Sequence, residues 1–294
     1  MRIEKKATII STSVAAILVA LKMTVGILSG SIAVLASAID SFLDLLVSAF
    51  NYFALHNAEK EPDEKFNFGR SKLEPLAAVV EGTIISVSGV FVFYQAISNI
   101  VHAKELSHID NSIWVMVVSL VLTAFLVIFL NTIAKKTGNM VIRADALHYK
   151  TDLFSNGAVL LALFLVSFTG EAIIDSILGI AIAIYMIVSA YPIIKDGVLM
   201  LLDAALEQED VNKIKDLLFS EKEITDYHDL LTRQSGSEIF VSVHVVFDNT
   251  ISLFDAHTVS DRIEDGIQDL FEDKEVNTIV HMDPYDDSDG MHLH

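Results

Sequence analysis

Six long apolar stretches account for most of the first two thirds of this 294-residue chain. A helix needs about 20 mostly apolar residues to cross the hydrocarbon core of a bilayer, and all six stretches are long enough. They lie at 8–28, 31–55, 76–101, 113–134, 145–169 and 173–199. The second and fifth stretches contain charged residues, so hydropathy alone would rate them lower. We expect six membrane-spanning helices.

Charge is distributed unevenly along the chain. From Ala204 onward there are 22 Asp and Glu residues against 6 Lys and Arg, whereas the preceding part has 17 against 14. A nearly neutral apolar part therefore precedes an acidic part of soluble character, and we expect two domains, residues 1–203 and 204–294. An acidic domain repels nucleic acid and suits cations.

Basic residues predict the orientation in the membrane. They lie before the first stretch, between the second and third, and between the fourth and fifth, whereas the alternate loops contain only Lys104. Cytoplasmic loops are enriched in Lys and Arg, so we expect both termini in the cytoplasm. Lys22 lies near the outer end of the first stretch, and we expect its long side chain to reach the membrane interface.

The acidic part alternates between helical and strand-like patterns. The expected order is helix, strand, strand, helix, strand, at Asp210–Leu218, Tyr227–Arg233, Glu238–Phe247, Leu253–Phe271 and Asn277–Met282. Ser235-Gly236 is the expected turn between the first two strands. The prediction is therefore an α-helical membrane protein with six transmembrane helices and a small cytoplasmic α+β domain.

Two pairs of ionisable residues lie inside the expected membrane helices. Asp40 and Asp44 are four residues apart in the second stretch, and His148 and Asp152 are four apart in the fifth. Each pair therefore lies on one face of its helix. At about 1.5 Å per residue, both pairs fall near the middle of a core about 30 Å thick. Four such groups at one depth can form a single tetrahedral site with three oxygen ligands and one nitrogen ligand.

An unliganded group of acids at that depth would be hard to maintain. An ionised carboxylate there costs at least ~2.5–3.5 kcal/mol. The alternative is that the acids pair with basic residues, but Lys150 is the only basic residue in the middle of the two stretches, and it points off the His148 face. Carboxylate and imidazole suit Zn²⁺, Cd²⁺, Fe²⁺ or Mn²⁺. The chain has no cysteine, which excludes thiolate ligands and argues against Cu⁺.

Four sequence motifs carry a family resemblance. They are ASAIDSFLDLLVS, FGRSKLEPLAA, ADALHYKTDLFSNGA and the late HDLLTRQSG…VSVH…IVHMDP. Through them the chain resembles the cation diffusion facilitator family along its whole length, and is most similar to its bacterial zinc and ferrous-iron efflux branch. The resemblance implies a homodimer in the bacterial inner membrane that exports Zn²⁺ from the cytoplasm. Because metal and protons compete for the same lone pairs, we expect export in exchange for protons. The resemblance also implies that a quartet of residues forms the transport site: Asp40, Asp44, His148 and Asp152.

The same resemblance implies a second metal site in the cytoplasmic part. Its expected ligands are His228, His244, His257, His281 and Asp283, with Asp283 suited to bridge two ions. Lys72 and Asp203 occupy positions that resemble the family's charge lock between protomers. The tail residues His292 and His294 are either weak ligands or disordered, and we expect disorder.

The loop after the second stretch departs from the family pattern. Relatives often bind a metal there through an Asp and two His. Here Asp63 stands at the Asp position, but Phe66 and Arg70 stand where the two histidines would be. One carboxylate beside an arginine cannot hold a divalent ion, so we expect a purely structural loop.

Two other functions compete with metal efflux. A membrane-anchored metal sensor would use the acidic part alone, but an anchor has no need of the intramembrane quartet. An intramembrane hydrolase is disfavoured because no HExxH helix or activated serine or cysteine nucleophile is evident. We therefore do not expect an enzyme. The residues leave the physiological ion open among Zn²⁺, Cd²⁺, Fe²⁺ and Mn²⁺.

Overall fold

The computed structural model describes residues 3–29, 32–102, 113–169, 173–272 and 274–286. The chain divides into two compact units, Met1–Val198 and Leu199–His294. The sixth helix of the structure, Ile173–Leu201, ends three residues past this division. The domain boundary between residues 203 and 204 stays a prediction.

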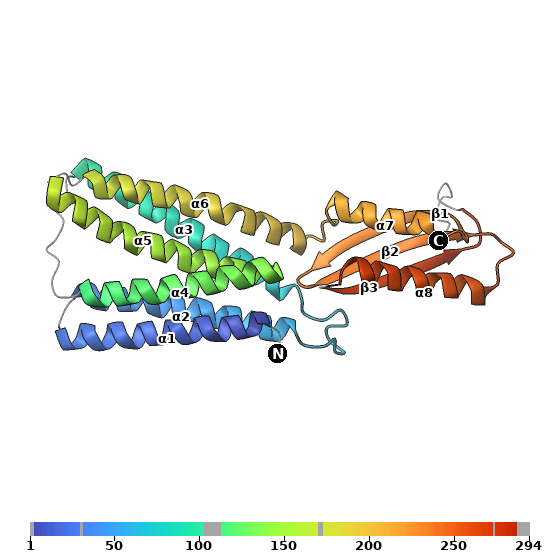
Figure 1. Ribbon diagram of the computed structural model, residues 1–294, viewed down its shortest axis with the longest axis horizontal. Helices are drawn as coiled ribbons and strands as arrows, with labels where there is room; N and C mark the ends of the chain where they lie inside the picture. The colour runs from blue at the N-terminus through green and yellow to red at the C-terminus, as the bar shows by residue number, and fades with distance from the viewer. Residues whose placement is uncertain (1–2, 30–31, 103–112, 170–172, 273, 287–294) are drawn as a thin grey trace. The chain divides into compact units, whose positions relative to one another are not determined.

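The first unit consists of six long helices (Figure 1). In chain order they are α1 (Ile3–Ser29), α2 (Ile32–Ala58), α3 (Leu73–His102), α4 (Ile113–Thr137), α5 (Met140–Thr169) and α6 (Ile173–Leu201). All six predicted helices are present. Among the described residues, five are long and apolar enough to cross a membrane, namely all except α5. The first half of α5 carries the charged residues of the candidate site.

A sharp connection positions α5 beside α4. Gly138 has a positive φ of 64° and its N–H bonds to the carbonyl of Ala134 at 2.9 Å, so it ends α4 as a left-handed cap. The next residue, Asn139, caps the start of α5, because its side-chain oxygen accepts hydrogen bonds from the N–H groups of Val141 (3.0 Å) and Ile142 (3.2 Å). The two helices therefore run antiparallel in close contact.

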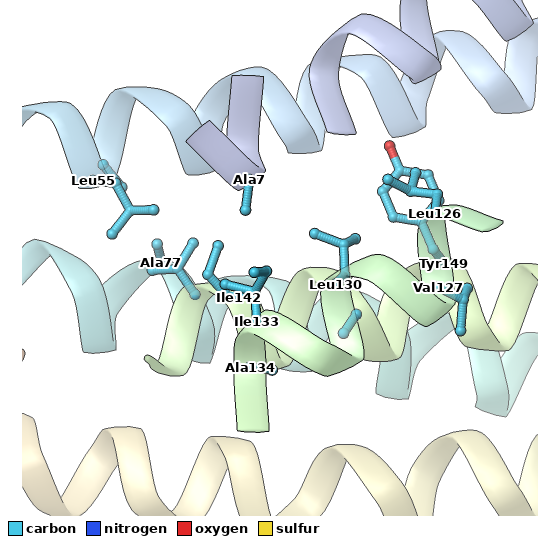
Figure 2. Close-up of a cluster of buried hydrophobic side chains, with 13 residues drawn as sticks. Ala7, Leu55, Ala77, Leu126, Val127, Leu130, Ile133, Ala134, Ile142 and Tyr149 are labelled. Atoms are coloured by element: carbon cyan, nitrogen blue, oxygen red, sulfur yellow. The ribbon is translucent and has the colours of Figure 1, made fainter. Parts of the chain in front are cut away.

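The buried core of the first unit lies where α4 and α5 meet the first three helices (Figure 2). Leu130 and Ile142 are fully buried there, as are small residues such as Ala7 of α1. Elsewhere α3 approaches α6 through glycines. A Cβ on Gly82 would lie 2.9 Å from Ile194, and one on Gly197 would lie 2.6 Å from Val79. Close approach through small residues is typical of membrane helices.

The second unit has the predicted order of elements. These are α7 (Gln208–Ser220), β1 (Ile224–Ser235), β2 (Glu238–Phe247), α8 (Leu253–Leu270) and β3 (Glu275–Asp283). The sheet order is β1-β2-β3, in which β1 and β2 form an antiparallel hairpin and β3 runs parallel to β2. The turn of the hairpin includes Gly236, whose φ is 57°.

Alternation along β2 separates the two faces of this sheet. Its odd-numbered residues from Ile239 to Val245 are buried in a core with residues of both helices, such as Ile214 of α7 and Ile263 of α8. Its even-numbered residues, including His244, therefore lie on the opposite face. That face carries the histidines of the second candidate site.

Candidate metal centres

Three residues from two helices converge inside the first unit. Nε2 of His148 on α5 lies 3.2 Å from Oδ1 of Asp44 on α2 and 3.7 Å from Oδ2 of Asp152, one turn further along α5. One ligand atom from each residue lies within 4.8 Å of the others. His148 is 9% exposed and both carboxylates are partly buried. Two oxygens and a nitrogen therefore face a common point.

Asp40, the fourth member of the predicted quartet, lies slightly apart. It lines the same cavity, of about 430 Å³, as the other three residues. It is more exposed than Asp44 and is not part of the group whose ligand atoms lie within reach of one another. The structure thus brings three of the four predicted residues together and places Asp40 one turn away on the cavity wall.

Lys22 corrects one expectation from the sequence. It was expected to extend to the membrane interface, and this is wrong. Lys22 is only 8% exposed, and its Nζ donates a hydrogen bond to Oγ of Ser41 at 2.7 Å. It also lies 3.4 Å from the carbonyl of Ser37 and lines the same cavity as the quartet. A hydroxyl and a carbonyl on α2 thus accept hydrogen bonds from the ammonium group, which lies inside the protein and not at the interface.

A buried polar network beside the site was missed by the sequence analysis. Nδ2 of Asn51 donates to Oε2 of Glu81 at 2.9 Å and lies 3.4 Å from Oδ1 of Asp145. Ser48 joins it, with its Oγ 2.7 Å from the hydroxyl of Tyr149 and 3.4 Å from Oδ1 of Asp145. Both acids are at most 1% exposed. Tyr149 connects this network to the apolar core of Figure 2.

Two signals in the sequence could have revealed this network. Glu81 is a lone acid inside the apolar stretch 76–101, and Asp145 lies three residues before His148, on nearly the same helix face. Among the described residues, Oδ1 of Asn51, Oε1 of Glu81 and Oδ2 of Asp145 are buried without a hydrogen-bond partner. Buried atoms of this kind are uncommon in proteins.

The second unit brings together four of its five predicted ligands. His228 lies opposite His244 in the hairpin, and His244 is in register with His281 of β3, so the three imidazoles form a row across the sheet. Asp283 joins them. Its Oδ2 lies 2.9 Å from Nδ1 of His244 and 3.4 Å from Nε2 of His228, and its Oδ1 lies 3.1 Å from Nε2 of His281.

The carboxylate of Asp283 thus lies between the three histidines and contacts them through both oxygens. It is 6% exposed, whereas His281 is largely exposed. Three imidazole nitrogens and a two-oxygen carboxylate match the ligands that Zn²⁺ prefers in proteins. The donor set therefore fits a metal, and the bridging role of Asp283 stays a prediction.

Two further residues bear on this second site. Asp229 follows His228 at an irregularity in β1, has a positive φ of 50°, and its Oδ2 lies 3.4 Å from Nδ1 of His228. The sequence analysis did not select it. His257 lies on α8, where its Nε2 is 3.8 Å from Asp261. Within the described part of the chain, His257 is not in any group of residues close enough to share a metal.

Nearly the whole chain is similar to known cation efflux proteins. A family described as the cation efflux transmembrane domain matches residues 8–202, and one described as the cation efflux protein, cytoplasmic domain, matches residues 206–285. The cation-efflux pumps FieF of Salmonella choleraesuis (strain SC-B67) and Salmonella newport (strain SL254) are 34% identical over 283 residues. These residues cover 96% of this chain and 93% of each pump. The chain belongs to the cation diffusion facilitator family.

A solved structure is also similar to part of the chain. It is the metal-bound C-terminal domain of the CzcD transporter from Thermotoga maritima, which is 20% identical in sequence and has a TM-score of 0.25. The match covers 26% of this chain and 90% of that domain. Membership of the cation diffusion facilitator family confirms the predicted fold class. It also makes the chain a multi-pass membrane transporter for cations and not an enzyme.

The loop between α2 and α3 differs from the metal-binding loop expected of many cation diffusion facilitators. Oδ2 of Asp63 forms an ion pair with Arg70, and Oδ1 accepts hydrogen bonds from the N–H groups of Lys65 (3.0 Å) and Phe66 (2.9 Å). Arg70 also lies over the ring of Phe66, 4.2 Å from its centre. The hydrogen bond from Arg70 is the main reason that the pKa of Asp63 lies below its ordinary value. Both carboxylate oxygens therefore have partners within the loop.

The predicted charge lock involves both units of this cation diffusion facilitator. Lys72 lies in the first unit, immediately before α3, and Asp203 lies in the second, where its Oδ1 is 3.2 Å from Arg233. Asp203 has a positive φ of 56°. Its part in a lock with Lys72 stays a prediction. His292 and His294 lie outside the described residues.

Proposed function

We propose that this transporter exports a divalent transition metal, with Zn²⁺ as its main substrate, from the cytoplasm in exchange for protons. The observation that carries the proposal is the convergence of Asp44, His148 and Asp152 on one cavity between α2 and α5. Carboxylate groups inside a membrane domain are costly unless they bind something. A divalent cation is the partner that two carboxylates and an imidazole fit best.

Competition between metal and protons provides the coupling. A metal ion binds the deprotonated forms of these side chains, so protons and metal compete for the same lone pairs. His148 is the member whose ordinary titration range is closest to neutral pH. Proton entry from the outer side would displace the metal there, and deprotonation on the cytoplasmic side would allow the next ion to bind. Alternating access of the cavity to the two sides completes the cycle.

The ligand set ranks the candidate metals. Zn²⁺ and Cd²⁺ accept mixed nitrogen and oxygen ligands in tetrahedral sites. Fe²⁺ also binds imidazole, whereas Mn²⁺ prefers oxygen ligands. Asp40 lies one turn from Asp44 and would complete a tetrahedral set if its carboxylate turned toward the other three residues. The proposed order is therefore Zn²⁺ and Cd²⁺ first, then Fe²⁺, then Mn²⁺.

The cytoplasmic domain is proposed to hold metal that is not transported. His228, His244, His281 and Asp283 would hold it, and His257 would join them only if α8 or another chain brought it closer. A bound metal there would cross-link the three strands and add to the stability of the domain. We propose a homodimer in the bacterial inner membrane, with both termini in the cytoplasm and Lys72 and Asp203 at the contact between protomers. The match of residues 206–285 to the family of cation efflux cytoplasmic domains supports the homodimer and the cytoplasmic position of this domain.

Metal flux in reconstituted vesicles tests the function. Purified protein in vesicles with an internal metal-sensitive dye should take up Zn²⁺ when a pH gradient is imposed, and Asp44→Ala should remove the uptake. Asp283→Ala should retain transport, because Asp283 lies outside the membrane unit. Absence of Zn²⁺ uptake by the unmodified protein would favour a sensor and refute the proposal, whereas wild-type flux in Asp44→Ala would refute the assignment of the transport site.

A further inference from the structure

A buried lysine shares the cavity with the proposed transport site. Lys22 of α1 is held by the side chain of Ser41 and the carbonyl of Ser37, both on α2. Ser41 is next to Asp40 in the sequence. The carboxylates of Asp44, Asp152 and Asp40 line the same cavity as Lys22.

The position of Lys22 is unexpected for a simple membrane-facing lysine. A lysine on the lipid side of a helix can extend its charge to the interface at low cost, but Lys22 turns into the protein instead. Burying an ammonium group is unfavourable unless charges or hydrogen bonds compensate for it. One hydroxyl and one carbonyl accept hydrogen bonds from the ammonium group, and the negative charges of the three carboxylates in the same cavity favour its charged form.

The formal charges of the cavity explain what the lysine would do. Three ionised carboxylates and a neutral imidazole carry a charge of −3, and a divalent ion reduces this to −1. The ammonium group of Lys22 brings the metal-loaded cavity to zero. A neutral cavity is the least costly one to enclose within a membrane protein, where charges interact strongly. The same positive charge repels the metal and therefore weakens its binding.

We propose that Lys22 is a fixed counter-ion of the transport site, which neutralises the metal-loaded cavity and keeps metal affinity low enough for release. This inference rests on the proposed function, since it assumes that the quartet binds the transported ion. It assigns Lys22 a positioning and electrostatic role. The lysine need not touch the metal, because its charge acts across the cavity.

The first measurement is the affinity for Zn²⁺ of full-length purified protein. All variants carry His244→Ala, because His244 belongs to both groups of possible cytoplasmic ligands, so that the cytoplasmic site does not contribute to the titration. Lys22→Met removes the charge but keeps the length of the side chain, and it should lower the Kd roughly tenfold or more. Lys22→Arg keeps the charge and should bind as the parent does. Ser41→Ala removes the hydrogen bond but keeps the charge, so its Kd should change much less than that of Lys22→Met.

The second measurement is transport by the same proteins in vesicles. If Lys22 assists release, Lys22→Met should show a lower KM for Zn²⁺ and a lower maximal rate. An unchanged or higher Kd in a folded Lys22→Met dimer would overturn the proposal and leave Lys22 as a tie between α1 and α2. If Lys22→Met does not fold, Lys22→Gln, which can still donate a hydrogen bond to Ser41, decides the question by the same comparison of Kd values.

The two proposals fail in different ways. If the parent protein shows no metal flux, the transport function itself is wrong, and if Asp44→Ala keeps the flux, the assignment of the transport site is wrong. If the parent transports and Asp44→Ala does not, while Lys22→Met keeps the parental Kd and KM, only the counter-ion proposal is wrong.

Discussion

Nε2 of His148 lies 3.2 Å from Oδ1 of Asp44, although the two residues are 104 positions apart in the chain. The contact joins α5 to α2 across the cavity and defines the centre of the proposed transport site. Because Asp152 approaches the same nitrogen from the next turn of α5, the imidazole lies between two carboxylates.

Removing either carboxylate should abolish transport. Asp44→Ala or Asp152→Ala leaves the metal with too few ligands, so vesicle uptake of Zn²⁺ should fall to background while the protein remains a folded dimer by size-exclusion chromatography. Asp196→Ala is the matched control. Asp196 is a half-exposed acid of the same unit that pairs with Arg143 at 3.6 Å. Wild-type flux in Asp44→Ala or Asp152→Ala would remove the basis for the transport site.

The identity of residue 148 should set both selectivity and pH dependence. In His148→Asp the site has only oxygen ligands, so preference for Zn²⁺ over Mn²⁺ should decrease in a competitive flux assay. The pH dependence of flux between about 6 and 8 should flatten or shift, because the imidazole is gone. His148→Glu controls for the shorter side chain of Asp. An unchanged metal ranking and pH profile in both variants would show that His148 is a packing residue.

Asp63 should be dispensable for metal binding. Asp63→Ala should leave the number of bound Zn²⁺ ions, measured by calorimetry, and the flux unchanged, because Arg70 and two backbone N–H groups already occupy this carboxylate. The pKa of Asp63 is lowered, so its pairing with Arg70 is complete above the ordinary carboxyl range near pH 4 and is lost only as the pH falls below it. Loss of one equivalent of Zn²⁺ would show that the loop binds metal after all.

Zinc should stabilise the cytoplasmic domain. A fragment of residues 206–294 should melt at a higher temperature with Zn²⁺ present, by an amount equivalent to about 2.7 kcal/mol at a free concentration one hundred times the Kd. Asp283→Asn should reduce this gain strongly, because Asp283 contacts three histidines. His257→Ala is the control and should keep the gain in melting temperature, since His257 lies outside that cluster. A melting temperature that does not respond to Zn²⁺ would contradict the second metal site.

The buried network around Asn51 should contribute to stability. Asn51→Leu removes the amide that donates to Glu81 and lies near Asp145, so two buried acids would lose a partner. We expect a loss of about 1–3 kcal/mol, seen as a lower melting temperature in detergent. Asn57→Leu on the same helix is the control, because Asn57 is partly exposed and bonds to the carbonyl of Phe53. Equal melting temperatures for the two variants would contradict a structural role for the network.

Local patterns predicted the secondary structure well. Each of the six apolar stretches is a helix, and β2 has the predicted bounds Glu238–Phe247. The i, i+4 spacing of His148 and Asp152 placed both on one helix face, and their atoms lie 3.7 Å apart. These successes share a cause, because helix and strand periodicity depends only on neighbouring residues.

Contacts between elements were harder to predict. The direction of the Lys22 side chain depends on how closely α1 packs against α2, and the separation of Asp40 from Asp44 depends on the rotation of α2 relative to α5. The network of Glu81, Asn51 and Asp145 joins three helices, and no single stretch of sequence shows it. The family resemblance grouped His257 with the other histidines, yet within this chain it lies on α8, beside Asp261 and apart from them.

The sequence by itself therefore determined the six membrane helices, the order of elements in the acidic domain and the residue types available to a metal, because hydropathy, periodicity and side-chain chemistry are local properties. Only the tertiary structure decided that Asp44, His148 and Asp152 share a point, that three histidines form a row beside Asp283, and that Lys22 faces the same cavity as the quartet. The physical reason is that these relations depend on helix rotation and strand register. Both result from the packing of side chains that are distant in the chain.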